Sequence, residues 1–222
     1  FDRERVLDLC RKIRSENLKI SWIARTRLEL VDRELLEEMA AAGCRMLMYG
    51  IESLSYEVQK YFNRPQISEE TTKKVIDMTA EAGISPFGFF IFGAPYEDEE
   101  NIERSIEFAR KSRLDFAQFS KLTPILNTSL YSDYVKASGC DYWREIVSGR
   151  IPEQRLSLTK ESLSDEKIET YIKKANFKFY FSFRRALRIL RRAKGFRHVF
   201  SMAKSGLVLF SDSICKTFRR GN

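Results

Sequence analysis

Polar residues follow each of the four most apolar segments in the first half of the chain, and their types suit a particular kind of ligand. In chain order they are Arg25 and Arg27, Glu52 and Ser53, Gly93 and Pro95, and Lys121 and Thr123. A carboxylate accepts hydrogen bonds from hydroxyl or ammonium groups, and an arginine binds a carboxylate through two parallel hydrogen bonds. A glycine beside a proline lets the backbone approach a flat ring closely. The set therefore indicates a zwitterionic or ribose-bearing ligand.

Each of these residues also has a plain structural interpretation. Glu52 can cap the segment that follows it, and the stretch from Gly93 can be a turn that leads into a helix. The two arginines can pair with the nearby acids Glu29 and Asp32, which is the interpretation we favour for Arg25. The ligand hypothesis therefore depends on whether the fold brings the whole set to one edge.

Several common kinds of catalytic site are not expected. The only histidine, His198, lies in a basic C-terminal segment, so a Ser–His or Cys–His nucleophile is unlikely to be assembled. No Walker loop and no Gly-x-Gly-x-x-Gly motif is present. No two cysteines have the two-to-four-residue spacing of a zinc or iron–sulfur ligand set; they stand at Cys10, Cys44, Cys140 and Cys215. We interpret them as small apolar core residues in a reducing compartment.

Helical and strand patterns alternate over the first 125 residues. Apolar spacing and capping residues predict helices over 4–13, 32–42, 68–82 and 97–112, and apolar runs predict strands over 18–24, 44–51, 84–93 and 115–124. The order of helix, glycine and strand occurs twice, with stop glycines at Gly43 and Gly83. Strands that alternate with helices imply right-handed crossovers and a parallel sheet. Ligands of such sheets bind at the carboxyl ends of the strands, where the polar residues stand.

The C-terminal part differs in composition from the rest. Residues 176–222 carry 12 Lys and Arg side chains and one acid, so they account for the net charge of +8 of the whole chain. Apolar residues at helical spacing from Ser164 onward predict a basic amphipathic helix that ends at Gly195, with a second helix after it. We therefore divide the chain into an α/β part (1–135), a connecting segment (136–163) and a helical extension (164–222). No apolar run reaches the ~18 residues of a membrane span.

The ordered motifs resemble the radical S-adenosylmethionine superfamily. They are AGC (42–44), GIES (50–53), GAPYE (93–97) and LTPILNTSLY (122–131), and the similarity covers roughly residues 1–135. The basic extension resembles the group that includes anaerobic magnesium-protoporphyrin ester cyclases and hopanoid methylases, whose members often carry a cobalamin-binding domain. The resemblance implies an α/β fold that is part of a (β/α)6 TIM-like barrel with parallel strands, followed by a C-terminal α-helical extension.

The resemblance also assigns roles to individual residues. Glu52 and Ser53 match the pair that meets the ribose and methionyl part of S-adenosylmethionine. The adenine is expected to contact a strand and turn at Ile91, Gly93 and Pro95, and backbone groups at Leu122 and Thr123. Arg27 matches the arginine at a strand end, and Arg64 stands where a lysine is usual. No catalytic residue is assigned.

The hallmark of the superfamily, three cysteines spaced Cys-x3-Cys-x2-Cys that bind a 4Fe–4S cluster, does not occur in this sequence. We expect these ligands, and the first two strands of the barrel, to lie upstream of Phe1. In the intact protein, the resemblance implies an enzyme that cleaves S-adenosylmethionine to a 5′-deoxyadenosyl radical, which abstracts hydrogen during a methylation, cyclisation or rearrangement. The chain alone is expected to be inactive.

Two other functions fit the sequence. One is a complete small lyase or aldolase with Lys121 as Schiff-base nucleophile and Glu52 as acid and base, although Lys121 reads as a solvated strand-end residue. The other is a non-catalytic module that binds a membrane or nucleic acid through its basic tail. For the enzyme we expect a small-molecule or lipid-like substrate, no specific nucleic acid, and a cytoplasmic protein whose residues 165–222 contact anionic membranes peripherally.

Overall fold

Four parallel strands form the centre of the molecule. The computed structural model describes residues 2–151 and 163–181, and its sheet has the order β1 (Trp22–Thr26), β2 (Cys44–Glu52), β3 (Ser85–Phe92) and β4 (Phe116–Lys121). Every neighbouring pair is parallel, and sequential strands lie side by side. This arrangement confirms the predicted α/β class and the predicted parallel sheet.

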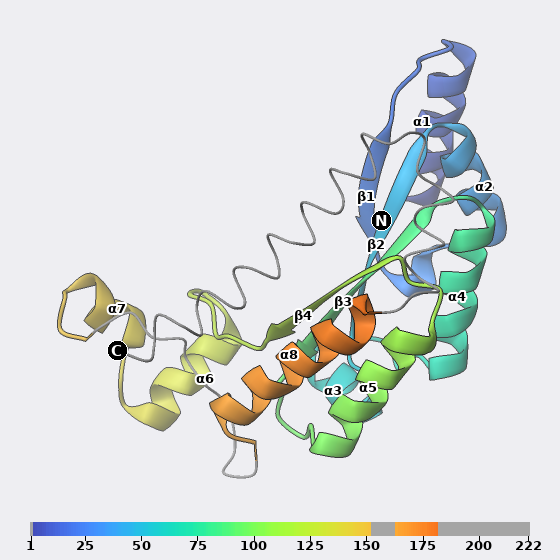
Figure 1. The fold of residues 1–222 in the computed structure, drawn as a ribbon. Helices are drawn as coiled ribbons and strands as arrows, with labels where there is room; N and C mark the ends of the chain where they lie inside the picture. The colour runs from blue at the N-terminus through green and yellow to red at the C-terminus, as the bar shows by residue number, and fades with distance from the viewer. Residues whose placement is uncertain (1, 152–162, 182–222) are drawn as a thin grey trace.

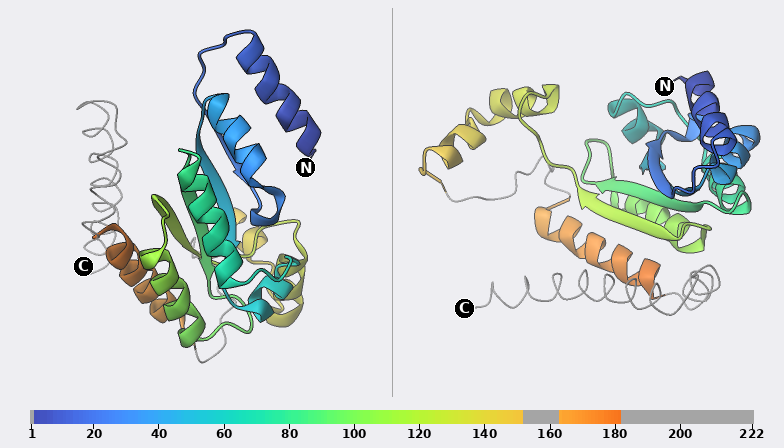
Figure 2. Two further views of the ribbon diagram at one scale, coloured as in Figure 1. Left: turned by 90° about the vertical axis from the view of Figure 1, so that its right-hand side faces the viewer. Right: turned by 90° about the horizontal axis from the view of Figure 1, so that it is seen from above.

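Helices cover one face of this sheet (Figures 1 and 2). The covering helices are α1 (Arg3–Ser15), α2 (Arg33–Ala41), α4 (Glu69–Glu81), α5 (Glu99–Lys111) and α8 (Asp165–Tyr180). The remaining ones are the short 3₁₀ helix η1 (Leu28–Leu30), α3 (Tyr56–Tyr61), α6 (Ser129–Ser138) and α7 (Tyr142–Val147). Helices α6 and α7 extend away from the sheet beyond the end of β4 (Figure 1). Over the described residues the sheet is therefore one curved layer of a barrel wall.

Capping residues explain where the covering helices begin and end. The side chains of Asp32, Ser68 and Asp98 each accept a hydrogen bond from a backbone N–H in the first turn of α2, α4 and α5. At the other end of α2, Gly43 has a φ of +93°, and a Cβ there would lie 2.2 Å from the carbonyl oxygen of Ile20. Only glycine fits this passage from helix to strand.

The hydrophobic core lies between the sheet and the helices. Alternate residues of β2 and β3 are buried on this side, among them Leu47, Tyr49, Phe90 and Phe92. The Tyr49 hydroxyl forms a 2.6 Å hydrogen bond with that of Thr79 on α4, so the largest polar group in this layer is satisfied. The core thus fixes which residues of each strand face the helices and which face away.

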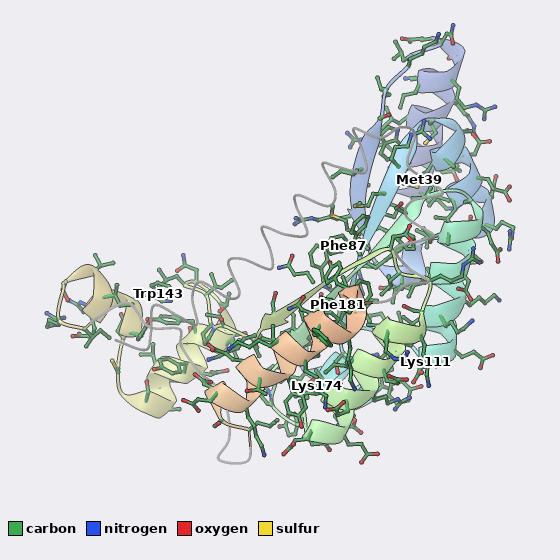
Figure 3. All side chains as sticks on the ribbon, viewed as in Figure 1. Met39, Phe87, Lys111, Trp143, Lys174 and Phe181 are labelled. Atoms are coloured by element: carbon green, nitrogen blue, oxygen red, sulfur yellow. The ribbon has the colours of Figure 1, made fainter. Side chains whose placement is uncertain are left out.

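The opposite face of the sheet carries large apolar side chains that no described helix covers. Met48, Phe87 and Phe89 are only partly buried, and Phe87 contacts both Phe89 and Phe116 through its ring (Figure 3). Strand pairing aligns Phe87 with Met48, so these residues share one face. At its carboxyl edge this face contains the polar residues singled out in the sequence.

Helix α8 lies at the beginning of the predicted helical extension. Ser164 caps it, and its buried residues Ile168, Ala175 and Phe179 pack against β4 and α5. Lysines on its outer surface pair with acids of α5, as Lys174 does with Glu103 (Figure 3). The rest of the extension, 182–222, lies outside the described residues.

The sequence patterns missed three short helices. α3 follows β2 after a loop of three residues and is only six residues long. α6 and α7 occupy a stretch that the sequence analysis interprets as loop and connecting segment. α6 runs across residue 135, where the sequence-based division separates the α/β part from the connecting segment. Short helices leave too few periodic positions for a helical pattern to stand out.

Among residues 2–151 and 163–181, no helix is both long and apolar enough to cross a lipid bilayer.

Removal of the Phe179 side chain tests the packing of α8. Phe179 is 0% exposed and its ring lies edge-on to Phe119 of β4 at 6.0 Å, so Phe179→Ala should lower the free energy of unfolding by about 3–5 kcal/mol. The matched control is Phe177→Ala on the same helix, where the ring is 57% exposed. The control should lose less than about 1 kcal/mol in urea unfolding. Equal losses in the two variants would contradict the packing of α8 on the sheet.

Candidate functional site

A cleft of about 510 Å³ lies at the carboxyl ends of the strands. It opens on the sheet face away from the helices, and every strand contributes to its lining. The lining residues are Arg25, Thr26, Arg27, Met48, Gly50, Glu52, Arg64, Phe89, Phe90, Ile91 and Ser120. Its size is that of a small-molecule site, and its walls combine apolar side chains with a few charged ones. The fold therefore assembles part of the polar set predicted from the sequence.

A tight turn at the end of β2 places Glu52 in this cleft. The pairing of β2 with β3 shifts between Gly50 and Glu52, so one extra residue, Ile51, is inserted as a β-bulge. The amide of Ser53 donates a 2.8 Å hydrogen bond to the carbonyl of Ile51, and Glu52 between them has a φ of +62°. A three-residue γ-turn with positive φ at a non-glycine centre is rare and strained. The bulge and turn redirect the Glu52 side chain at the point where the strand ends.

The Glu52 carboxylate lies against the backbone and beside one cation. A Cβ on Gly50 would come within 2.5 Å of Glu52 Oε1, so a larger residue here would require the carboxylate to shift. Burial raises the pKa of Glu52, and the Arg64 guanidinium, 3.4 Å away, lowers it. With the side chain only 13% exposed, Glu52 is a sheltered acceptor held ready for hydroxyl or ammonium donors.

The two arginines of the first strand behave differently from each other. Arg27 pairs with Glu29 at 2.5 Å, and its buried Nε has no hydrogen-bond partner among the described residues. Arg25 does not pair with any described acid, contrary to expectation, and its guanidinium lies 5.5 Å from the centroid of the Phe89 ring. Asp32 is bound by Arg3 of α1 instead. Both arginines therefore keep hydrogen-bonding capacity at the cleft.

Of the other predicted site residues, some line the cleft and some lie in the loops that support it. Ile91 lines the cleft. Gly93, with a φ of +89°, and Pro95 form the turn after β3. Ser53 is fully buried, and its hydroxyl bonds within the protein, so only its neighbour Glu52 reaches the cleft.

Leu122 and Thr123 stand just past the end of β4. The Leu122 amide donates to the carbonyl of Phe92 at 2.8 Å, and its side chain packs in a small cluster with Val58 and Ala94. The Thr123 hydroxyl donates to the carbonyl of Lys121 at 3.4 Å. The Leu122 amide is thus committed to the sheet and is not available to a ligand.

Glu97 is a buried acid that the sequence interpretation did not single out. Its Oε2 accepts hydrogen bonds from the amides of Gly93 at 2.6 Å and Ala94 at 3.4 Å, and its Oε1 accepts one from the Ser53 hydroxyl. Burial raises its pKa to about 7, against the opposing effect of these hydrogen bonds. The interpretation had assigned this acid to the start of a helix. The sequence signal that could have identified Glu97 as part of the site is its position directly after Gly-Ala-Pro-Tyr.

Lys121 is not the solvated lysine that its position suggested. Its side chain is 3% exposed, and its Nζ lies 2.5 Å from a carboxylate oxygen of Asp165 at the start of α8. The expectation failed because α8, far along the chain, covers the end of β4. A Schiff-base nucleophile must be accessible to its substrate, whereas this amine is buried and bound to Asp165.

The sequence matches known proteins at two levels. Residues 1–109 match the profile of the Radical SAM superfamily. An uncharacterized methyltransferase from Pyrococcus horikoshii is 28% identical over 183 residues, which are 81% of this chain and 38% of that protein. A bacteriochlorophyllide d C-12(1)-methyltransferase from Chlorobaculum tepidum is 26% identical over 52% of this chain and 26% of its own length. The chain thus spans well under half the length of these relatives.

Solved structures show the same fold. The radical S-adenosylmethionine methyltransferase TsrM from Kitasatospora setae, with cobalamin and a 4Fe–4S cluster bound, aligns with a TM-score of 0.54 at 16% identity, over 82% of this chain and 35% of that one. Methylornithine synthase aligns with a TM-score of 0.51 at 17% identity, over 80% and 44%. The expected partial barrel of parallel strands is consistent with both.

The cleft residues fit S-adenosylmethionine. The carboxylate of Glu52 supplies an acceptor, and Arg27, whose Nε has no partner among the described residues, supplies a donor in the same cleft. Phe89 and Ile91 supply an apolar wall at the same edge. A zwitterion with a ribose and a flat base needs this combination of groups.

The described residues do not fit an iron–sulfur cluster. Across residues 2–151 and 163–181 no three Cys, His, Asp or Glu side chains gather in a way that could hold a metal ion. Cys10 and Cys44 are buried, and burial raises the pKa of both thiols, to about 11 for Cys44, which opposes the thiolate form that binds iron. This agrees with the interpretation of these two cysteines as core residues.

Loss of the Arg64 charge should raise the pKa of Glu52 further. Arg64 is the cation that offsets the effect of burial, so Arg64→Met leaves burial unopposed. A ¹³C NMR titration of the carboxyl carbon measures the change. The control is Arg27→Met, since Arg27 lines the same cleft but pairs with Glu29. An unchanged Glu52 titration in Arg64→Met, or an equal shift in the control, would contradict this description of the site.

Proposed function

Because residues 1–109 place this chain in the Radical SAM superfamily, we propose that it forms the S-adenosylmethionine-binding part of a radical enzyme. One observation carries the proposal. The strained turn at the end of β2 holds a sheltered carboxylate, Glu52, in a cleft at the carboxyl edge of a parallel sheet. Strain of this kind persists where function requires a side chain at a defined place.

The residues of the cleft take complementary roles in this proposal. Glu52 accepts hydrogen bonds from the ribose hydroxyls or the ammonium group of the cofactor. Arg27 and Arg64 are the cations available to its carboxylate. Ile91 and the Gly93 turn, with carbonyl groups after β4, receive the adenine. Ser53 and Leu122 support the loops of the cleft and do not contact the cofactor in this proposal, because their polar groups form hydrogen bonds within the protein.

The chemistry comes from the cofactors and the protein orients them. In the intact protein, a 4Fe–4S cluster would supply the one-electron reduction of S-adenosylmethionine that starts radical chemistry, and Glu52, Arg27 and Arg64 are the residues of this chain that would hold S-adenosylmethionine for it. The described residues contribute the binding of S-adenosylmethionine and do not supply cluster ligands.

The relatives support a reaction subtype but do not determine a substrate. Both relatives described above are methyltransferases by name, and TsrM was solved with cobalamin. We therefore put methylation first, with cobalamin as a further cofactor, and keep cyclisation and rearrangement as alternatives. Met48, Phe87 and Phe89 lie on a sheet face that no described helix covers, and their apolar side chains favour an apolar small molecule, including a lipid-like one, as substrate.

The rival functions find less support. The lyase hypothesis needs a free Lys121, whereas Lys121 is buried in an ion pair with Asp165. A purely non-catalytic module would not need the strained Glu52 turn. Peripheral contact of residues 165–222 with an anionic membrane stays part of our proposal. The lysines of α8 that pair with Glu99 and Glu103 of α5 are already occupied, so the other basic residues of this segment would make the contact.

Glu52→Gln should weaken binding of S-adenosylmethionine by about tenfold or more, because hydrogen bonds to a charged group contribute roughly 1.5–3 kcal/mol. Isothermal titration calorimetry measures the affinity. The control is Glu57→Gln, an exposed acid five residues further on that bonds to Ser55. Equal affinity in wild type and Glu52→Gln would remove Glu52 from the site.

The chain should sediment with vesicles of anionic lipid at low salt and be released at high salt. Each basic residue near such a surface adds about 1 kcal/mol. Arg191→Glu with Arg192→Glu should reduce recovery, whereas reversal of the exposed Lys12 and Lys136 should not. Recovery that is equal on neutral vesicles, or absent on both kinds, would leave the extension without a membrane role.

A further inference from the structure

Glu97 connects the two loops that border the proposed cofactor site. Its side chain is only 7% exposed, and its carboxylate bonds to the amides of Gly93 and Ala94 in the turn after β3. The same carboxylate accepts the hydroxyl hydrogen of Ser53 in the loop after β2, at 3.4 Å. The two loops are far apart in sequence, and this side chain bonds to both.

The network continues to the residues that receive the ligand. Ser53 directly follows Glu52, and its Oγ also accepts the amide of Ser55, the residue that caps α3. Gly93 begins the turn assigned to the adenine. Glu97 is not among the residues that line the cleft. A change of its side chain would nevertheless alter the hydrogen bonds of both loops that border the cleft.

We propose that Glu97 is a positioning residue whose ionised carboxylate holds the loops after β2 and β3 together, so that Glu52 and the Gly93 turn receive S-adenosylmethionine jointly. The inference rests on the proposed function for the identity of the ligand. The linkage between the loops is a property of the chain itself and can be measured without the cofactor.

The charged groups around Glu97 leave it without a compensating cation. On its own segment Asp98 is an acid and raises the pKa of Glu97. On β2, Glu52 pairs with Arg64; on α3, Glu57 bonds to Ser55. On β4, Lys121 pairs with Asp165, and no salt bridge to Glu97 lies within the described ranges. Only the two amides and one hydroxyl oppose the effect of burial.

The linkage should therefore depend on pH near neutrality. Burial raises the pKa of Glu97 to about 7, so the carboxylate gains a proton as the pH falls through this value. Hydrogen bonds from Gly93 and Ala94 to a neutral carboxyl are weaker than those to a carboxylate. An opening of the turn after β3 that breaks these two bonds while Glu97 stays buried should therefore be more frequent at lower pH, because the bonds lower the pKa of Glu97, and cofactor affinity should fall with it.

The first test uses the chain without cofactor. Amide hydrogen exchange at Gly93 and Ala94, corrected for intrinsic rates, should become about tenfold more protected between about pH 6 and pH 8, as the carboxylate forms. In Glu97→Gln the protection should not change with pH. The Thr71 amide, bound to the non-titrating hydroxyl of Ser68, is the internal control. If protection of the Gly93 amide does not change with pH in the wild type, the proposed linkage is overturned.

The second test separates positioning from stability. The raised pKa means that the folded state holds its proton more tightly than the unfolded state, so burial of the charge lowers stability as the pH rises from about 4.5 to 7. At about pH 8, Glu97→Gln should then unfold at the same temperature as the wild type or higher, yet bind S-adenosylmethionine about fivefold more weakly. A parallel loss of stability and affinity would indicate a merely structural role and overturn the proposal.

The outcomes distinguish this inference from the proposed function. If exchange responds to pH but the affinities of wild type and Glu97→Gln agree, the positioning role is wrong and cofactor binding stands. If exchange responds but neither wild type nor Glu52→Gln binds S-adenosylmethionine, the proposed function fails, and with it the ligand named here.

Discussion

The parallel pairing of β2 with β3 is the constraint on which the candidate site depends. Because the two strands run the same way, their carboxyl ends meet at one edge, and residues 38 or 39 positions apart become neighbours. The hydrophobic core on one face fixes the register of both strands, since a slip of one residue would expose Tyr49 and Phe92. The position of Glu52 beside the Gly93 turn follows from this burial.

The bulge between Gly50 and Glu52 is the point where the regular sheet gives way to the site. The register on the core side continues through Ile51, which stays buried, while Glu52 turns toward the cleft with a positive φ. Such a conformation costs of order 1–3 kcal/mol, which the surrounding core must supply. Gly50 then matters for its missing side chain, because any Cβ would meet the carboxylate.

Much of the fold was predictable because its signals are local. Caps at Asp32 and Asp98 and stop glycines at Gly43 and Gly83 mark helix ends in the sequence itself, and the alternation of helices and strands predicts a parallel sheet. The cleft was predictable in outline for the same reason. What the sequence could not show were contacts between distant segments, such as the ion pair that α8 makes with Lys121. The hydrogen bond from Ser53 to Glu97, which joins two loops 44 residues apart, is of the same kind.

The central claim is that S-adenosylmethionine binds at the carboxyl edge of the sheet beside Glu52. A crystal structure of the chain grown with S-adenosylhomocysteine, the stable analogue, tests it most directly. The account predicts the ligand in the cleft, with ribose or ammonium groups within hydrogen-bonding distance of Glu52 and the adenine beside Ile91 and the Gly93 turn. A ligand ordered at another surface, or an empty cleft at saturating analogue, would contradict the account.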